Sequence, residues 1–352
     1  MTLKASRFFS FLIGGLILTA CASNGGTSMA PMTPAIRPDV ANRQALATPG
    51  HFRNLHLYVT STAPYFFSGY SLPLHNGALP RFNETGVNEP VPVTGDLSDL
   101  YVGSFDEGTI YVYRLPLAIA TSKTLRSEAS PHESNLPLSG SRSLYAARRS
   151  ATDGAIPSGL GDLSGLAVAG GRLYAAGAGR ADHEVLEYKL PLVAGEAPSA
   201  RLVGFPNLDF LSLAAKNGTL YVASTTNGTV AAYRLPLRNA EAPEYTIPTA
   251  PQIDGATGVA VNAESSYLYV SLFALGDVYQ YPLPYHAGEA PTVLNVRLES
   301  QGGLPYGIAV ARNHLFVTAH SILAYRIPLA SNATPEASIS FAGSAAGVAA
   351  GN

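Results

Sequence analysis

Short strand-like segments with alternating side chains recur along most of the chain. In the fifth such unit, residues 258–261 form a small apolar stretch and residues 267–270 a second, while the side chains of residues 278–283 alternate between two faces. Pro284 cannot donate to a strand ladder and ends the third segment, and residues 292–296 form a fourth after a turn. The pattern therefore predicts four short strands in each unit.

Two sequence motifs mark these units and indicate that there are six of them. The first is Tyr-x-Leu/Ile-Pro-Leu/Tyr, which begins at Tyr70, Tyr113, Tyr188, Tyr233, Tyr281 and Tyr325. The second lies upstream of it and is a Leu-aromatic-Val/Ala triplet, which begins at Leu57, Leu100, Leu173, Leu220, Leu268 and Leu315. Successive markers lie about 43 to 48 residues apart, except for one interval of about 75. A period in the mid-forties made of short strands is typical of the blades of a β-propeller.

The two ends of the repeated region complement each other. The first unit begins near Asn54 and lacks the Gly-x-Ala-Val segment of later units, whereas residues 347–352 supply a similar segment at the end of the chain. A C-terminal strand would thus become the inner strand of the first blade and leave no unpaired seam. We predict an all-β fold over residues 51–352: a six-bladed β-propeller of four-stranded blades, closed by the C-terminal strand joining the first blade.

The long interval between the second and third units contains an insertion at residues 121–150. An insertion of this size in a repeat array usually lies on one face and can carry binding residues. This one includes Pro131, His132 and the basic pair Arg148 and Arg149. The alternative interpretation is a solvated loop or hairpin that extends the second blade.

The N-terminal residues have the build of a secretory signal. Lys4 and Arg7 precede an apolar run over residues 8–18, which is too short to span a bilayer. Residues 18–21, with the sequence Leu-Thr-Ala-Cys, resemble the lipobox of bacterial lipoproteins, in which the cysteine thiol is acylated. The resemblance implies a signal peptide at residues 1–20 and a lipid such as palmitate on Cys21. The alternative is an ordinary cleaved signal peptide in which the cysteine stands by chance.

Lipidation of Cys21 would anchor the protein to the outer side of a cell membrane without a transmembrane helix. If the source is a diderm bacterium, Ala22 in place of an aspartate after the cysteine favours the outer membrane. Residues 21–50 are rich in Ser, Gly, Asn, Pro and Ala and are predicted to form a flexible tether. Cys21 is the single cysteine of the chain, so intramolecular disulfides are excluded.

Composition agrees with this organisation and narrows the class of partner. The chain has 34 glycines, 26 prolines and 13% charged residues, which is typical of many turns and short strands. Its formal net charge of −2 becomes more negative when Lys4 and Arg7 leave with the signal. A mildly acidic surface does not favour nucleic acid, because phosphates require a basic face.

The repeat resembles those of the NHL-repeat and YncE-like β-propellers of bacteria over residues 54–352. The shared features are Gly-x-Ala-Val followed by Leu-Tyr-Val-Ala-Ser, as at residues 220–224, and the turn Asn-Gly-Thr-Val at residues 227–230. The resemblance implies a binding or scaffolding module. A smaller related set, the gluconolactonase-like and strictosidine-synthase-like propellers, uses the central cavity for chemistry. The set of metal-ligating residues typical of the gluconolactonase type cannot be located on the predicted inner strands of this sequence.

Candidate binding residues recur just before the predicted inner strands. Asp162, Asp209 and Asp254 hold this place in neighbouring blades, where three carboxylates can ring the axial opening and bind Ca²⁺ through oxygen ligands. The alternative, which the sequence favours, is that each aspartate caps a loop by accepting backbone hydrogen bonds. Phe210 and Tyr306 are expected near the axis, where they would line a binding mouth together with Asp209 and Asp254.

A second group of candidates consists of two histidines and one aspartate. Asp182 and His183 stand in a loop of the third blade and His320 in the corresponding loop of the sixth, where histidine can act as a base or a ligand. The alternative is that these are solvated loop residues. The sequence therefore favours a non-catalytic binding module without a cofactor, whose partner is a protein, a peptide or an envelope glycan. A metal-dependent hydrolase or lactonase is the rival hypothesis.

Overall fold

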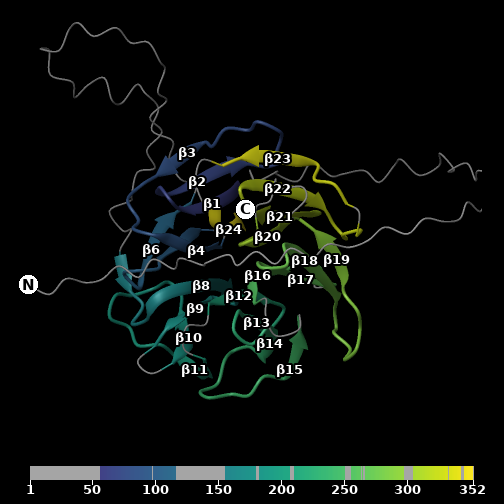
Figure 1. Cartoon of the computed structure of the whole chain (residues 1–352). Helices are drawn as coiled ribbons and strands as arrows, with labels where there is room; N and C mark the ends of the chain where they lie inside the picture. The colour runs from purple at the N-terminus through teal and green to yellow at the C-terminus, as the bar shows by residue number, and fades with distance from the viewer. Residues whose placement is uncertain are drawn as a thin grey trace, which may run out of the picture. The chain divides into compact units, whose positions relative to one another are not determined.

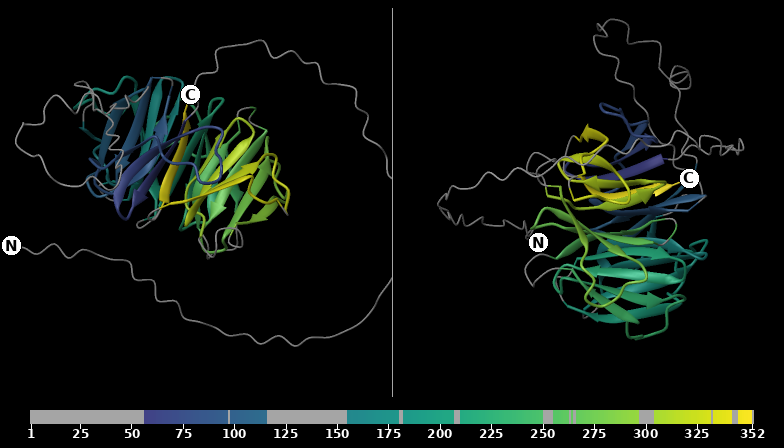
Figure 2. Two further views of the ribbon diagram at one scale, coloured as in Figure 1. Left: turned by 90° about the horizontal axis from the view of Figure 1, so that it is seen from above. Right: turned by 90° about the vertical axis from the view of Figure 1, so that its right-hand side faces the viewer.

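Each repeated unit forms one four-stranded antiparallel sheet, and six sheets surround a common axis (Figures 1 and 2). The computed structural model describes residues 56–96, 98–115, 155–179, 182–206, 210–249, 255–262, 264, 266–296, 304–331, 333–341 and 345–351. Within these ranges the regular structure consists of strands alone, and no helix that could cross a membrane is found there. The prediction of an all-β, six-bladed propeller is confirmed.

The first three blades, from the innermost strand outward, have the following strands. Blade 1 comprises β24 (Ala345–Gly351), β1 (His56–Thr62), β2 (Tyr65–Ser71) and β3 (Phe82–Glu84). Blade 2 comprises β4 (Pro90–Gly95), β5 (Asp99–Ser104), β6 (Thr109–Arg114) and β7 (Ala155–Pro157). Blade 3 comprises β8 (Gly161–Ala169), β9 (Arg172–Ala178), β10 (His183–Lys189) and β11 (Ala200–Phe205).

The remaining blades follow the same order along the chain. Blade 4 comprises β12 (Leu211–Lys216), β13 (Thr219–Ser224), β14 (Thr229–Arg234) and β15 (Tyr245–Pro248). Blade 5 comprises β16 (Ala256–Val261), β17 (Tyr267–Leu272), β18 (Asp277–Pro282) and β19 (Thr292–Asn295). Blade 6 comprises β20 (Ile308–Ala311), β21 (His314–Thr318), β22 (Ser321–Arg326) and β23 (Ala337–Ser340). Neighbouring inner strands contact one another around the whole ring.

The Leu-aromatic-Val triplet explains how the blades pack together. It occupies the second strand of each blade, where successive side chains point to opposite faces. In blade 1, Leu57 and Val59 pack in one buried cluster with Phe316 of blade 6. Tyr58 lies between them in sequence and packs in a different cluster with Val102 of blade 2. Each such side chain stabilises the fold by roughly 1.5–3 kcal/mol through burial, so the alternating triplet joins every blade to both neighbours.

Ring closure takes place inside blade 1, as the sequence predicts. β24 pairs antiparallel with β1, with Val59 opposite Val348 (Figure 1). The Thr60 hydroxyl donates to the Val91 carbonyl at 2.8 Å and accepts from the Gly347 amide at 2.7 Å. A Cβ on Gly347 would overlap the Val91 carbonyl oxygen, so only glycine allows β4 of the next blade to approach this closely.

The long interval belongs to blade 2. β6 ends at Arg114, and the chain returns at Ala155 as β7, which pairs with β6 as the outer strand of the same sheet. The predicted insertion at residues 121–150 therefore falls between the third and fourth strands of this blade, but it lies outside the described residues. The predicted signal peptide at residues 1–20, the tether at residues 21–50 and Cys21 also lie outside them.

Candidate axial binding site

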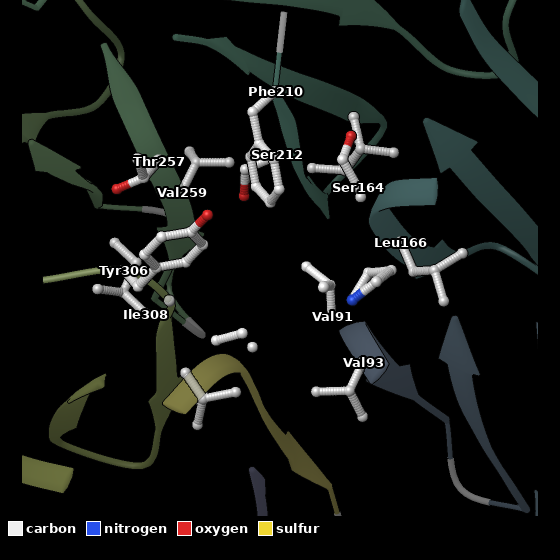
Figure 3. Close-up of a pocket in the computed structure, with 17 residues that line it drawn as sticks. Val91, Val93, Ser164, Leu166, Phe210, Ser212, Thr257, Val259, Tyr306 and Ile308 are labelled. Atoms are coloured by element: carbon white, nitrogen blue, oxygen red, sulfur yellow. The ribbon is translucent and has the colours of Figure 1, made fainter. Parts of the chain in front are cut away.

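A small cavity lies on the axis between the six inner strands. Its volume is about 60 Å³, and its walls are mainly apolar side chains such as Val91, Val93, Val259 and Ile308 (Figure 3). This volume holds on the order of four water molecules, whereas pockets that enclose small-molecule ligands usually measure about 300–1,000 Å³. A larger ligand must therefore rest on the end of the cavity and cannot enter it.

Three aromatic side chains stand at one end of this cavity, and we call them the axial aromatic cluster: Phe210, Phe273 and Tyr306. The Phe210 and Tyr306 ring centroids lie 5.7 Å apart with planes at 80°, and those of Phe273 and Tyr306 lie 5.6 Å apart with planes at 84°. Both pairs are edge-to-face, a favourable geometry for aromatic rings. In Figure 3 the rings of Phe210 and Tyr306 point inward, among the side chains that line the cavity. Both residues line the axial cavity, and their role in binding stays a prediction.

The backbone holds the aromatic residues in place from several blades. The Tyr306 amide donates to the Thr318 carbonyl at 2.8 Å, and the Ser271 hydroxyl of blade 5 donates to the Tyr306 carbonyl at 2.9 Å. The Phe210 amide donates to the Thr225 hydroxyl at 2.9 Å in the turn after β13. The rings are thus attached to a rigid part of the fold, as a preorganised binding surface requires.

Phe273 was not predicted from the sequence, although a signal for it exists. It is the first residue of the turn between β17 and β18, and its side chain remains 38% exposed. Turn positions usually hold Gly, Pro, Asn, Asp or Ser. An exposed phenylalanine is therefore an unusual residue for such a turn, and its ring packs on Tyr306.

Three carboxylates lie beside the cluster, and we call them the mouth carboxylates: Glu89, Asp106 and Asp162. Glu89 precedes β4, Asp106 is in the turn after β5, and Asp162 lies in β8. Burial, a hydrogen bond to Asp106 and the negative charges of both aspartates raise the pKa of Glu89 to about 7. Burial and then the charge of Glu89 raise the pKa of the Tyr306 hydroxyl. Glu89 therefore connects the mouth carboxylates electrostatically to the axial aromatic cluster.

The structure places only one of the three predicted aspartates. Asp162 is exposed and lies within β8 instead of before it, because the strand begins with an irregularity between Gly161 and Gly165 where Asp162 has a φ of 42°. Asp209 and Asp254 lie outside the described residues. Among the residues that are described, no three His, Cys, Asp or Glu side chains are placed to hold a metal ion.

The second group of candidates does not form a common site. His183 begins β10 in blade 3 and is 8% exposed, and its Nδ1 has no hydrogen-bond partner in the described part of the chain. Asp182 beside it is exposed, and its carbonyl accepts from the Gly179 amide at 2.8 Å. His320 is exposed in the turn after β21, in blade 6. Blades 3 and 6 stand on opposite sides of the ring, so the two histidines do not act together.

Comparison with known proteins identifies the fold and no family. No protein family model matches the chain, and no curated protein matches it either. A chain from the crystal structure of a nidogen/laminin complex is similar at a TM-score of 0.54, with 14% identity over 84% of this chain and 98% of that one. A functionally unknown protein from Desulfotomaculum acetoxidans has a TM-score of 0.46, with 12% identity over 81% of this chain and 80% of that one. The WD40 propeller domain of Doa1 has a TM-score of 0.44, with 12% identity over 69% and 67%.

The similarity to the chain from the nidogen/laminin complex and the sheet order agree on the fold. The chain contains a six-bladed β-propeller of four-stranded blades. At identities this low the likeness concerns the fold alone, because one fold supports many functions. The residues at the axial end of the ring are therefore the basis for proposing what the protein binds.

Proposed function

We propose that this protein is a binding module of the cell envelope, anchored by lipid on Cys21, that contacts its partner through the axial mouth. The axial mouth is the end of the cavity formed by the axial aromatic cluster and Glu89. The observation that carries the proposal is that three rings from separate connections gather over a cavity of about 60 Å³, too small to enclose a substrate. Partly exposed aromatic side chains on a rigid frame are typical of interface hot spots.

The sequence supports a partner in the envelope. The signal at residues 1–20 and the lipobox at residues 18–21 favour export and anchoring, and the tether at residues 21–50 would give the propeller reach above the membrane. A protein, a peptide or another envelope component would be accessible from that position. The propeller then acts as a scaffold whose contact surface is built from turns.

Site-specific cross-linking in the full chain tests this proposal. Benzoylphenylalanine in place of Phe273 is expected to form a defined adduct in intact cells. The same photoreactive residue in place of Val193 serves as the control, because Val193 is 59% exposed in the connection after β10, at the opposite end of the blades. Equal adducts at both positions, or none at Phe273, would contradict the axial mouth as the contact surface.

The anchor is tested separately. Cys21→Ser is expected to move the protein from the membrane fraction to the soluble fraction and to abolish incorporation of a palmitate analogue. Retention of the variant in the membrane fraction would contradict lipid anchoring through this residue.

The rival function has its own measurement. Stoichiometric Ca²⁺ in the full chain, lost when Asp162, Asp209 and Asp254 are all changed to alanine, would favour a metal-dependent hydrolase over a binding module.

A further inference from the structure

We infer that the axial mouth binds an organic ammonium group, which packs on the axial aromatic cluster and is neutralised by the carboxylate of Glu89. The inference rests on the proposed function, because it assigns a ligand class to the same surface. Two observations carry it: the orientation of the rings, and the absence of a counterion for the nearby carboxylates among the described residues.

The rings have the arrangement that favours a cation. Tyr306 stands between Phe210 and Phe273, and both phenylalanine planes are within about 10° of perpendicular to it. Rings that meet at right angles present a face and an edge to neighbouring space, as in the aromatic cages that hold ammonium groups. The exposed part of Phe273 leaves this corner open to solvent.

The mouth carboxylates differ from the buried carboxylates elsewhere in the fold. Glu184 pairs with Arg201 at 3.2 Å, and Glu187 pairs with Arg172. In the described part of the chain, none of Glu89, Asp106 and Asp162 forms an ion pair. A cation supplied by a ligand would remove the repulsion among them.

The chemistry of the site favours an organic cation over a metal ion. Among the described residues, no three His, Cys, Asp or Glu side chains, the mouth carboxylates included, are placed so that they could hold one metal ion. Aromatic faces attract ammonium groups through the ring quadrupole, whereas hard divalent ions require several oxygen ligands. The cavity behind the rings measures about 60 Å³, so any part of the ligand beyond the ammonium group would remain outside it.

Binding should be linked to release of a proton. Glu89 is faced by Asp106 from the turn after β5, by Asp162 from β8 and by Tyr306 before β20. A bound cation stabilises the ionised form of Glu89, so affinity should increase as pH rises from about 6 to about 8. A histidine that must be neutral for a cation to bind would give the same direction, so loss of the pH dependence in Glu89→Gln is the result that identifies Glu89 as the titrating group.

Calorimetric titration of the full chain with tetramethylammonium chloride tests the inference. Saturable binding with a millimolar Kd is expected, with none for tert-butanol, a neutral molecule of similar shape. Phe273→Leu and Glu89→Gln should each weaken binding about three- to tenfold, because each removes a direct contact with the cation. Tyr65→Leu and Glu196→Gln are matched controls: Tyr65 is 45% exposed at the same end of blade 1, and Glu196 is exposed beyond β10.

Butylammonium distinguishes two sources of the ammonium group. Tighter binding of butylammonium than of tetramethylammonium would assign the site to a primary amine such as a lysine side chain. Tighter binding of tetramethylammonium would assign it to a quaternary group such as a choline headgroup. In either case the increase in affinity with pH should disappear in Glu89→Gln.

Several results would overturn the inference. They are equal binding of tert-butanol, no saturable binding of either cation, or unchanged affinity in both Phe273→Leu and Glu89→Gln. A cross-link at Phe273 without any cation binding would reject the ammonium ligand and leave the axial mouth as a contact surface. Loss of both would reject the proposed function as well.

Discussion

We call the interfaces between neighbouring blades the seams. Polar groups have opposite surroundings in the seams and at the axial mouth. In the seams, two buried side chains accept from backbone amides of the next blade: Glu187 accepts from the Leu237 amide at 2.8 Å, and Gln280 accepts from the Leu329 amide at 2.7 Å. At the mouth, three carboxylates repel one another, and Glu89 has a φ of 42°. The seams therefore stabilise the ring, whereas the mouth retains unfavourable interactions of the kind found at functional sites.

Substitutions in the seams should therefore change stability, whereas substitutions at the mouth should change binding. A seam residue contributes free energy to the closed ring and has no free surface to offer a partner. A mouth residue is partly exposed, and its replacement removes repulsion or contact area without opening the ring.

Removal of residues 345–352 should have the largest effect. It deletes β24, opens the sheet of blade 1 and exposes the apolar interface between blades 6 and 1. The expected loss exceeds about 5 kcal/mol, comparable to the whole stability of many proteins. Circular dichroism should show no cooperative thermal transition. A chain lacking Asn352 alone is the control, and a normal melting curve for the longer deletion would contradict closure by β24.

Gly347→Val should destabilise the protein by about 3 kcal/mol, because its side chain would overlap the Val91 carbonyl and separate blades 1 and 2. Chemical denaturation measures the change in the free energy of unfolding. Ser340→Val on the exposed edge of β23 is the matched control and should change stability by less than about 0.5 kcal/mol. Equal effects of the two substitutions would show that the close approach at Gly347 is unimportant.

Thr60→Val should cost about 1–3 kcal/mol, since it removes the hydroxyl that joins Val91 to Gly347 and leaves buried backbone groups unpaired. Thr60→Ser retains the hydroxyl and should recover most of this loss in the same denaturation experiment. If the serine variant is as unstable as the valine variant, packing of the Thr60 methyl group outweighs the hydrogen bonds.

Glu89→Gln should have the smallest effect on stability and the opposite sign. The pKa of Glu89 rises from its ordinary value of 4.5 to about 7 on folding. Between these values the unfolded chain has lost the proton and the folded chain keeps it, so the parent loses stability as pH rises. Above pH 7 the variant should be more stable by up to about 1 kcal/mol after solvent screening, and near pH 4 the two should melt alike. Glu196→Gln should show no such trend, and a less stable Glu89→Gln at pH 8 would contradict the repulsion.

The fold could be predicted from the sequence because its determinants are local and repeated. The triplet that begins at Leu57 and the marker that begins at Tyr70 recur in every blade. Because the first unit lacks an inner-strand segment, the sequence predicts that the similar segment at the C-terminus supplies it. Phe210 and Tyr306 were placed near the axis because each stands just before an inner strand.

The rest of the site depends on how irregular connections converge, which repeat spacing does not encode. Glu89 precedes an inner strand, β4, that lacks the Gly-x-Ala-Val pattern, so no motif marked it. Asp106 and Phe273 belong to turns after second strands, and their proximity to the axis follows from the three-dimensional order of blades. The position of Asp162 within β8 results from a strand irregularity that composition does not reveal.

The pairing of β24 with β1 also sets the order of events during synthesis. The Thr60 hydroxyl and the Gly347 carbonyl that it approaches are 287 residues apart in the chain, so the inner edge of blade 1 stays open until β24 has been synthesised. Contacts over such sequence distances form late. A product that ends before β24 would keep that edge exposed to proteases, so the fold itself discriminates between chains with and without this strand.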